Sequence, residues 1–485
     1  MANAPGAPLM TFHALAQAVK GECISRSGPA DGGFDSVALD SRSLRPGALF
    51  VALPGSTQDG HRYVEAAFKS GAAGAMVARS QLEDPGLGLR KQPGVLVAVE
   101  DTLRGLQDAA RCYLDRFPHL LRIGITGSSG KTTTKEIAAA MIGQEKQVVM
   151  NPGNLNSETG LPLAVFAVRD CHEVGIFEMG MNRKGEIEEL ARVLKPQIAL
   201  ITNIGTAHIG KIGSRLAILY EKRRIFSQFT GIETALLPRD NADGELLAQG
   251  IRGNIGFYGP DSLEELGAIA EKGLDGTDII WGGISVSFGL PGRHNVKNAL
   301  AAAAIAKAVP VGPDAIRAGL GAVKPLFGRG EIIRGALQGR RWYAKDGAPA
   351  SPQPVTVIRD CYNANPESME EALAFCDALE WPGRRVYVIG AMGELGPASP
   401  GAHKKLGAAL AASRADRVFL YGPEAKSAAG QGRKVPFVYT DTMSDLSAEL
   451  GAYIRPGDLV LLKGSRGCAL ERALEGIFLE YKARE

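Results

Sequence analysis

The chain has 485 residues, more than one hydrophobic core usually holds, which predicts about two to four domains. Its 45% hydrophobic and 22% charged residues are typical of a soluble globular protein. The formal charge of +3 is spread along the chain without a long basic run, so we expect neither nucleic acid nor a membrane surface as a partner.

Cysteine usage and hydropathy indicate where the protein works. The six cysteines form no CxxC pair, and the first residues lack a charged leader followed by an apolar core. No window approaches about 18 uninterrupted apolar residues, so no membrane-spanning helix is expected. We therefore expect a cytoplasmic protein in a reducing compartment.

Three α/β domains are expected in chain order. Residues 1–118 contain short apolar runs typical of buried strands, such as ALFVAL and GAMVA. Residues 119–327 alternate strand and helix, which predicts a mostly parallel sheet with ligands at the carboxyl ends of its strands. A glycine-rich stretch near Phe327 then leads into 328–485, where the alternation resumes and predicts a second doubly wound, Rossmann-like domain. Only 340–354 interrupts it, as an expected exposed loop.

The central range has the clearest periodicity. Apolar segments predict strands at 122–127, 174–181 and 198–205. Amphipathic segments predict helices at 131–143 and 185–194 between them. Parallel strands joined in this way bring the residues after each strand to one edge of the sheet.

A glycine-rich turn follows the first of these strands. Residues 127–132 read GSSGKT, and Ile125 stands where the usual Walker pattern has its first glycine. Backbone amides at a helix N-terminus attract an anion, Lys131 supplies a cation, and the hydroxyl of Thr132 can bind magnesium. A Gly-Ser turn before a helix is common, but Gly-Lys-Thr after a strand is not, so we predict a phosphate-binding loop.

Two further side chains follow strands of the same predicted sheet. Glu178 ends the strand VGIFE, where its carboxylate could hold a metal ion that bridges phosphates. His208 follows the next strand and could contact that metal or its water. Either residue alone could be a solvated strand end or a structural histidine, but together they favour a metal site.

Three other residues have less distinctive surroundings. Lys222 lies in the charged segment LYEKRRIF, where a lysine is ordinarily exposed to solvent. Asn295 and Asn298 open an alanine-rich helix, where their amides could bind the edge of an adenine or cap the helix. The residues themselves leave these alternatives open.

The chain resembles the Mur ligase family of ATP-dependent amide-bond-forming enzymes of cell-wall synthesis. It contains, in order, the motifs DSRSLRPGALFVALPG, TGSSGKTTTKE, NPGNLNSETGLPL, FEMGMNRKGEI, TNIGTAHI, GRHNVKNALAAAAIA, GRGE and DCYNANPESMEEAL. The family uses a short GxxGK[ST] loop, so Ile125 is no defect. The resemblance implies a small α/β UDP-muramoyl-binding domain at 1–118, a central P-loop-type ATP-binding domain at 119–327 and a C-terminal Rossmann-like domain at 328–485.

The resemblance also implies a reaction. The family moves the γ-phosphoryl group of ATP onto a peptide carboxylate, and an amine attacks the acyl phosphate to give an amide, ADP and phosphate. It implies ATP and Mg²⁺ as cofactors and catalytic roles for Lys131, His208 and Lys222. Lys222 matches a lysine that carries a carbamate, which requires a neutral amine. We expect Arg223 and Arg224, with magnesium, to lower its proton affinity by like-charge repulsion.

Further site residues are implied motif by motif. The implied ATP-binding residues are Gly127, Ser128, Ser129, Gly130, Lys131, Thr132, Thr133, Asn295, Asn298, Arg329 and Asp360. The implied metal ligands are Thr132, Glu178, His208 and Lys222. The implied substrate-binding residues are Ser41, Arg42, Asn154, Asn156, Glu158, Tyr362, Asn363 and Asn365.

The YNANP signature at 362–366 points to the substrates. It marks the family member that adds D-alanyl-D-alanine to a UDP-N-acetylmuramoyl-tripeptide, and the DNPR signature of the diaminopimelate-adding sibling is absent. Alternatives are another Mur-type or folylpolyglutamate-type ligase of the same fold, a phosphotransferase, or a nucleotide-binding scaffold without turnover. A monomer is expected, and no motif identifies the third residue of the tripeptide.

Overall fold

The computed structural model describes residues 8–25, 32–55, 58–239, 243–337, 353–431 and 434–478. Most of the exposed loop predicted at 340–354, namely residues 340–352, lies outside these ranges. In the part of the chain that is described, none of the helices combines the length and apolar composition needed to cross a membrane.

The N-terminal part is built on a five-stranded sheet with the strand order β2-β7-β6-β5-β4. These strands are β2 (Glu22–Ser25), β4 (Ser36–Ala38), β5 (Ala48–Val51), β6 (Gly74–Ala78) and β7 (Val95–Val99). The helices are α1 (Phe12–Ala18), α2 (Val64–Lys69) and α3 (Thr102–Leu114), and β1 (Met10–Thr11) pairs with β3 (Gly33–Phe34). The predicted apolar runs are confirmed as β5 and β6, which are buried and parallel to each other.

The central part contains a six-stranded, fully parallel sheet with the strand order β13-β12-β11-β8-β10-β9. Its strands are β8 (Leu121–Thr126), β9 (Val148–Met150), β10 (Val174–Glu178), β11 (Ile198–Ile201), β12 (Thr234–Pro238) and β13 (Asn254–Tyr258). Its helices are α4 (Lys131–Ile142), α5 (Gly160–Val165), α6 (Glu186–Leu194), α7 (Ile209–Ile212), α8 (Arg215–Arg223), α9 (Gly244–Ala248), α10 (Arg293–Lys307) and α11 (Pro313–Ala322). The predicted strands and helices of this range are confirmed.

The strand order explains why a ligand would bind above β8. The chain leaves β8 for β9 on one side, and the later connection from β10 to β11 crosses to the other side of β8, so the loop after β8 opens at a switch point of the sheet. Open α/β sheets bind ligands at such points, because neighbouring loops diverge there and leave a crevice.

A three-stranded antiparallel sheet extends the central part and was not predicted. It consists of β14 (Leu266–Glu271), β15 (Thr277–Trp281) and β16 (Ile284–Phe288). Gly282 and Gly283, both with positive φ, form the tight β15–β16 hairpin turn that the sequence signals. Trp281 and Phe288 are buried against α10 and α11, which attaches this sheet to the core.

The C-terminal part is the predicted second doubly wound domain. Its sheet has the order β17-β18-β22-β19-β20-β21 and is parallel except for the edge strand β17. The strands are β17 (Glu331–Gly335), β18 (Val355–Asp360), β19 (Arg385–Gly390), β20 (Arg417–Tyr421), β21 (Phe437–Thr440) and β22 (Leu459–Lys463). The helices are α12 (Pro366–Ala378), α13 (Ser399–Ala412) and α14 (Met443–Tyr453), and separate apolar clusters cover the two faces of the sheet.

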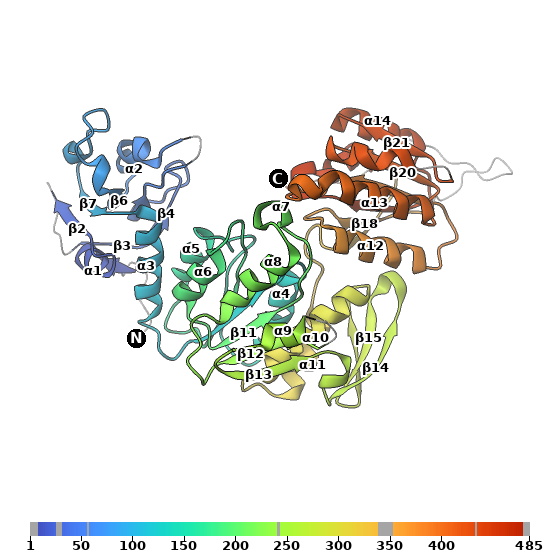
Figure 1. The fold of residues 1–485 in the computed structure, drawn as a ribbon, viewed down its shortest axis with the longest axis horizontal. Helices are drawn as coiled ribbons and strands as arrows, with labels where there is room; N and C mark the ends of the chain where they lie inside the picture. Colours follow the sequence, from blue (N-terminus) through green and yellow to red (C-terminus); the bar gives the residue numbers. More distant parts are fainter. Residues whose placement is uncertain are drawn as a thin grey trace.

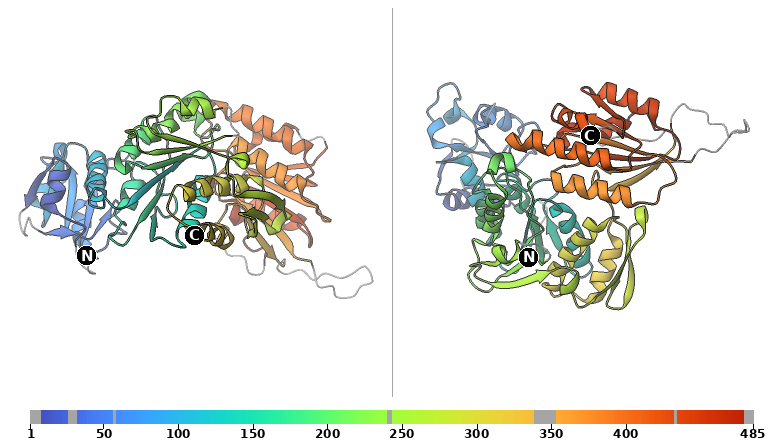
Figure 2. Two further views of the ribbon diagram at one scale, coloured as in Figure 1. Left: turned by 90° about the horizontal axis from the view of Figure 1, so that it is seen from below. Right: turned by 45° about the vertical axis from the view of Figure 1, so that its right-hand side comes forward.

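The three parts follow one another in space, with the central sheet between the other two (Figures 1 and 2). Helix α3 lies at the first junction, where Tyr113 of α3 and Phe34 both pack against Phe166 of the central part. At the second junction, α7 of the central part lies next to the C-terminal part (Figure 1). The residues that precede α7 therefore face both the central sheet and the C-terminal domain.

Candidate active site

The loop after β8 is held by the segment after β11. Asn203 Oδ1 accepts hydrogen bonds from the backbone amides of Ser128 and Ser129, at 3.1 and 3.0 Å. A Cβ atom on Gly127 (φ +155°) would lie 1.7 Å from Thr202 Oγ1. The turn can therefore close against β11 only with glycine at that position. Its amides stand at the N-terminus of α4, as a phosphate site requires.

Two lysines meet at Gly127, the first residue of this loop. Lys131 Nζ and Lys222 Nζ each donate to the backbone oxygen of Gly127, at 2.9 Å in both cases. Lys222 is only 1% exposed, so the expectation that a lysine in this charged segment faces solvent is wrong. Residue type alone suggested exposure, but α8 turns this position toward the phosphate loop.

The surroundings of Lys222 lower the proton affinity of its amine. Burial lowers the pKa of Lys222 well below its usual range, and the positive charge of Lys131 acts in the same direction. The predicted direction is confirmed, but the cause differs. Arg223 donates to the Leu247 carbonyl and Arg224 pairs with Glu188, so both neighbours are engaged elsewhere.

Glu178 lies at the carboxyl end of β10, as predicted, and it is buried. Its Oε2 accepts a hydrogen bond of 2.5 Å from Thr132 Oγ1, and its Oε1 accepts one of 2.6 Å from Asn156 Nδ2. The backbone amide of Glu178 donates to Asn151 Oδ1. These bonds hold a hydroxyl and a carboxylate oxygen together beside the phosphate loop, which is the hard-oxygen donor chemistry that Mg²⁺ prefers.

His208 occupies the N-cap position of α7 in a left-handed backbone conformation (φ +64°). Its Nδ1 lies 2.5 Å from Oε2 of Glu394, which belongs to the C-terminal part. The close approach of the His208 imidazole lowers the pKa of Glu394 to about 2, and the neighbouring Lys211 acts in the same direction. Within the described ranges, no three His, Cys, Asp or Glu side chains are grouped as a metal site. A metal ion here would need ligands of other kinds as well, such as Thr132 and phosphate oxygens.

The two asparagines of α10 reach the same site without capping their helix, because Gly292 is the N-cap. Asn295 Nδ2 donates to the Pro291 carbonyl at 2.9 Å. The Oδ1 atom of Asn298 lies so close to Gly130 that a Cβ atom there would be 2.2 Å from it. Asn298 therefore packs against the phosphate loop.

The YNANP segment joins β18 to α12 and reaches the site from the C-terminal domain. Asn365 Oδ1 caps α12 by accepting from the Ser368 amide at 2.8 Å, in a capping box, and Pro366 is the first helical residue. This local role was not predicted, and it uses the side-chain oxygen of Asn365 rather than its amide NH2. The Arg329 guanidinium stacks 4.1 Å above the Tyr362 ring, while Asp360 pairs with Lys463 at 2.7 Å.

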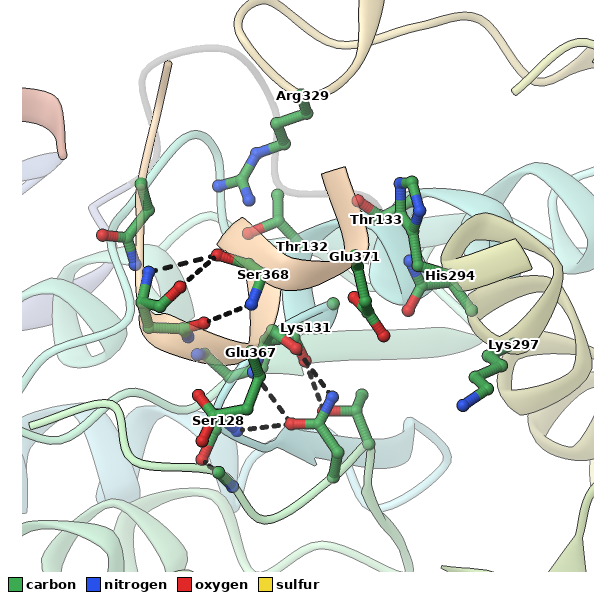
Figure 3. Close-up of a pocket in the computed structure, with 18 of the residues that line it drawn as sticks. Ser128, Lys131, Thr132, Thr133, His294, Lys297, Arg329, Glu367, Ser368 and Glu371 are labelled. Carbon is green, nitrogen blue, oxygen red and sulfur yellow. Dashed lines mark hydrogen bonds between the residues drawn. The ribbon is translucent and has the colours of Figure 1, made fainter. Parts of the chain in front are cut away.

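These elements enclose one cavity of about 510 Å³ between the central and C-terminal domains. Figure 3 shows side chains of the phosphate loop and of α12 facing the same space, with His294 and Lys297 of α10 at its side. The predicted residues that line it are Ser128, Ser129, Gly130, Lys131, Thr132, Thr133, Asn154, Asn156, Glu178, His208, Asn295, Asn298, Arg329, Asp360, Tyr362, Asn363 and Asn365.

Five predicted site residues do not line this cavity. Gly127 is the first residue of the loop, and its backbone oxygen accepts a hydrogen bond from the buried Lys222. Glu158 instead pairs with Arg183 at 2.5 Å, so its carboxylate is already engaged. Ser41 and Arg42 belong to the N-terminal part, where the Arg42 side chain is exposed and pairs with Asp40.

Sequence reasoning missed several residues that line or support the site. Lys463 ends β22, and a lysine at the carboxyl end of a buried strand, in LLKGSRG, was an available signal. Asn203 lies two residues after the end of β11, and a polar residue at the carboxyl end of a buried strand was again an available signal. Glu367 and Glu371 lie on α12 and line the cavity, but nothing in their local sequence distinguishes them from solvated helix residues.

Comparison with family models matches most of the chain. The Mur ligase family catalytic domain matches residues 34–102, the Mur ligase middle domain matches 125–306, and the Mur ligase glutamate ligase domain matches 340–466. These segments fall in the N-terminal, central and C-terminal parts respectively.

Relatives and solved structures agree with the family models. The chain is 41% identical over 473 residues to the UDP-N-acetylmuramoyl-tripeptide–D-alanyl-D-alanine ligase of Treponema pallidum, covering 96% of this chain and 98% of that one. It is 33% identical over 449 residues to the Bacillus subtilis ligase of the same name, covering 91% and 92%. The fold is similar to a crystal structure of MurF from Acinetobacter baumannii, with a TM-score of 0.81 and 27% identity over 96% and 98% of the two chains. It is also similar to MurF from Thermotoga maritima in complex with ADP, with a TM-score of 0.75 and 27% identity over 91% and 96%. The chain belongs to the Mur ligase family.

Proposed function

We propose that this protein is an ATP-dependent ligase that joins D-alanyl-D-alanine to a UDP-N-acetylmuramoyl-tripeptide. The product would be the UDP-muramoyl-pentapeptide used in peptidoglycan synthesis. One observation carries the proposal: a phosphate loop, Glu178, His208 and the YNANP segment all line a single cavity between two domains. The names of the relatives at 41% and 33% identity support the choice of substrates.

The proposed reaction has two steps. The carboxylate of the tripeptide takes the γ-phosphoryl group of ATP, forming an acyl phosphate and ADP. The amine of D-alanyl-D-alanine then attacks the acyl carbon, phosphate leaves, and the amine loses a proton as the amide forms. The first step brings two anions together, so the amides at the start of α4 and the cations Lys131 and Arg329 would stabilise its transition state.

Mg²⁺ fits the donors present at the edge of the sheet. Thr132 Oγ1 and Glu178 Oε2 are already 2.5 Å apart, and the His208 imidazole lines the same cavity. The ion would neutralise phosphate charge there. Lys222 would add a further negative charge near the Mg²⁺ ion as a carbamate, which forms when its neutral amine adds CO2 and releases a proton. The low proton affinity of this buried amine supports that modification.

The remaining assignments are also proposals. Ser41 and Arg42 would contact the UDP group in the domain at 1–118, and Asn154 would lie near the muramoyl peptide. The six cysteines all fall within the described ranges and none forms a disulfide, which supports a reducing, cytoplasmic location. We propose that the protein acts as a monomer.

A turnover assay tests the function. Phosphate release would be measured with ATP, D-alanyl-D-alanine and UDP-muramoyl tripeptides that end in lysine, ornithine or diaminopimelate. We expect release that requires both the tripeptide and the dipeptide, with a pentapeptide product of matching mass. Faster reaction with free D-alanine, another amino acid or glutamate plus folate would assign the chain to another ligase of this fold. Retention of phosphate on the product would indicate a phosphotransferase.

A further inference from the structure

The segment that carries His208 is held by the C-terminal domain. Glu394 follows β19 and has a left-handed backbone conformation (φ +63°). Its carboxylate lies between His208 Nδ1, at 2.5 Å, and Lys211 Nζ, at 3.1 Å. Its backbone oxygen accepts a hydrogen bond of 3.1 Å from the amide of Gly210. One residue of the C-terminal domain therefore makes three polar contacts with residues 208–211.

The backbones of the two domains touch at this point. A Cβ atom on Gly210 would lie 2.5 Å from the Gly396 nitrogen, and one on Gly396 would lie 2.8 Å from the Gly210 Cα. Real Cβ atoms essentially never approach heavy atoms so closely. Glycine at both positions is what allows Glu394 to reach the imidazole.

A second contact holds the other side of the same segment. Glu367 of α12 accepts hydrogen bonds from the Thr206 amide at 2.8 Å and from the Thr206 hydroxyl at 3.2 Å. His208 thus lies between two places where carboxylates of the C-terminal domain hold the central domain. Its left-handed conformation is unfavourable for a residue with a side chain, and these contacts support it.

We infer that Glu394 is a positioning residue that orients the His208 imidazole when the C-terminal domain contacts the central domain. The negative charge of a carboxylate 2.5 Å from Nδ1 favours the tautomer with its proton on Nδ1 and its lone pair on Nε2, the form that can ligate a metal or accept a proton. Because Glu394 and His208 belong to different domains, closure of the domains and orientation of the histidine become one event. This inference rests on the proposed function.

Three variants separate this role from a structural one. Glu394→Ala removes the carboxylate. Lys211→Met is the matched control, since it removes the other ion pair of Glu394 but leaves the contact with His208. Gly210→Ala leaves every charge in place and suits helix α7, where Gly210 has no positive φ, but its methyl group would push residues 394–396 away.

Turnover and metal dependence give the first readouts. For Glu394→Ala we expect kcat to fall about 10- to 100-fold and the Mg²⁺ concentration for half-maximal rate to rise, as for other lost partners of metal-binding histidines. The KM for the UDP-muramoyl substrate should stay within about twofold, and Lys211→Met should stay within about twofold in every parameter. Gly210→Ala should resemble Glu394→Ala. The double variant Gly210→Ala/Glu394→Ala should lose little more activity than the single variant with the larger loss, because both changes break the same contact between the domains.

Readouts without turnover keep the test independent of the substrate assignment. Imidazole ¹⁵N shifts, assigned with His208→Gln, should show a single tautomer in the wild type with MgADP and a mixture in Glu394→Ala. Small-angle X-ray scattering with MgADP should show a larger radius of gyration for Gly210→Ala. Wild-type tautomer and Mg²⁺ dependence in Glu394→Ala would overturn the inference. A wild-type enzyme that rejects D-alanyl-D-alanine but shows the expected ¹⁵N change would instead overturn only the proposed substrates.

Discussion

Lys131 and Lys222 donate to one and the same backbone oxygen, that of Gly127. Their amino groups are therefore within about 6 Å of each other, a separation at which like charges lower each other's pKa. Lys222 is buried and Lys131 is partly buried, and the loss of hydration lowers the pKa of each. The loop thus combines a lysine suited to phosphate with a second one that is driven toward the neutral form.

The first prediction concerns the carbamate on Lys222. Lys222→Ala should lose nearly all ligase activity, and short-chain carboxylates such as acetate should restore part of it by occupying the vacated anionic position. Lys69→Ala is the control, because Lys69 pairs with Glu65 on the surface of the N-terminal part and should leave activity nearly unchanged. Near-normal activity of Lys222→Ala in bicarbonate-free buffer would remove Lys222 from the catalytic residues.

The second prediction concerns stability and pH. The pKa of Lys222 is low in the folded protein and about 10.4 in the unfolded chain, so between these values the unfolded state binds a proton that the folded state lacks. Wild-type stability should therefore rise with pH across this window. Lys222→Met removes that dependence, so it should melt at a higher temperature than the wild type near neutral pH. The difference should shrink toward pH 10 in melting curves recorded without CO2, and a constant difference would show that Lys222 is charged when folded.

The third prediction concerns Lys131. Lys131→Ala should abolish ATP-dependent ligation, because it removes the cation beside the phosphate loop, and losing such a contact should raise the barrier by at least several kcal/mol. Lys146→Ala, which loses only a surface pair with Glu173, should behave like the wild type. Circular dichroism would check that both variants fold. A Lys131→Ala enzyme with more than about a tenth of wild-type turnover would contradict the role.

The fourth prediction separates the two roles of Asn365. Asn365→Ala should destabilise the C-terminal domain by about 1 kcal/mol through loss of the α12 cap. Asn365→Asp keeps a capping oxygen, so its melting temperature should match the wild type. Both variants lack the amide NH2, and both should raise the KM for D-alanyl-D-alanine roughly tenfold if that group donates to the dipeptide. Wild-type KM in Asn365→Asp would limit Asn365 to capping the helix.

Local sequence was enough to predict the architecture around the site. The hydrophobic patterns of 122–127 and 131–143 predict a strand and a helix, and the structure contains them as β8 and α4. The GSSGKT turn between them lies at the N-terminus of α4, where backbone amides can bind an anion. Glu178 at the end of β10 follows from the same rule, since parallel strands end at one edge of the sheet. These features depend on residues that are close together in the chain and on the regular geometry of strands and helices, so the sequence is enough to predict them.

Tertiary structure decided what each side chain meets. Lys222 belongs to a segment that reads as solvated, yet α8 buries it against Gly127, which is 95 residues away in the chain. Glu394 and His208 come from different domains, and no local pattern relates them. A charge or tautomer is set by burial and by partners within a few ångströms, and in a three-domain chain those partners are brought together only by folding.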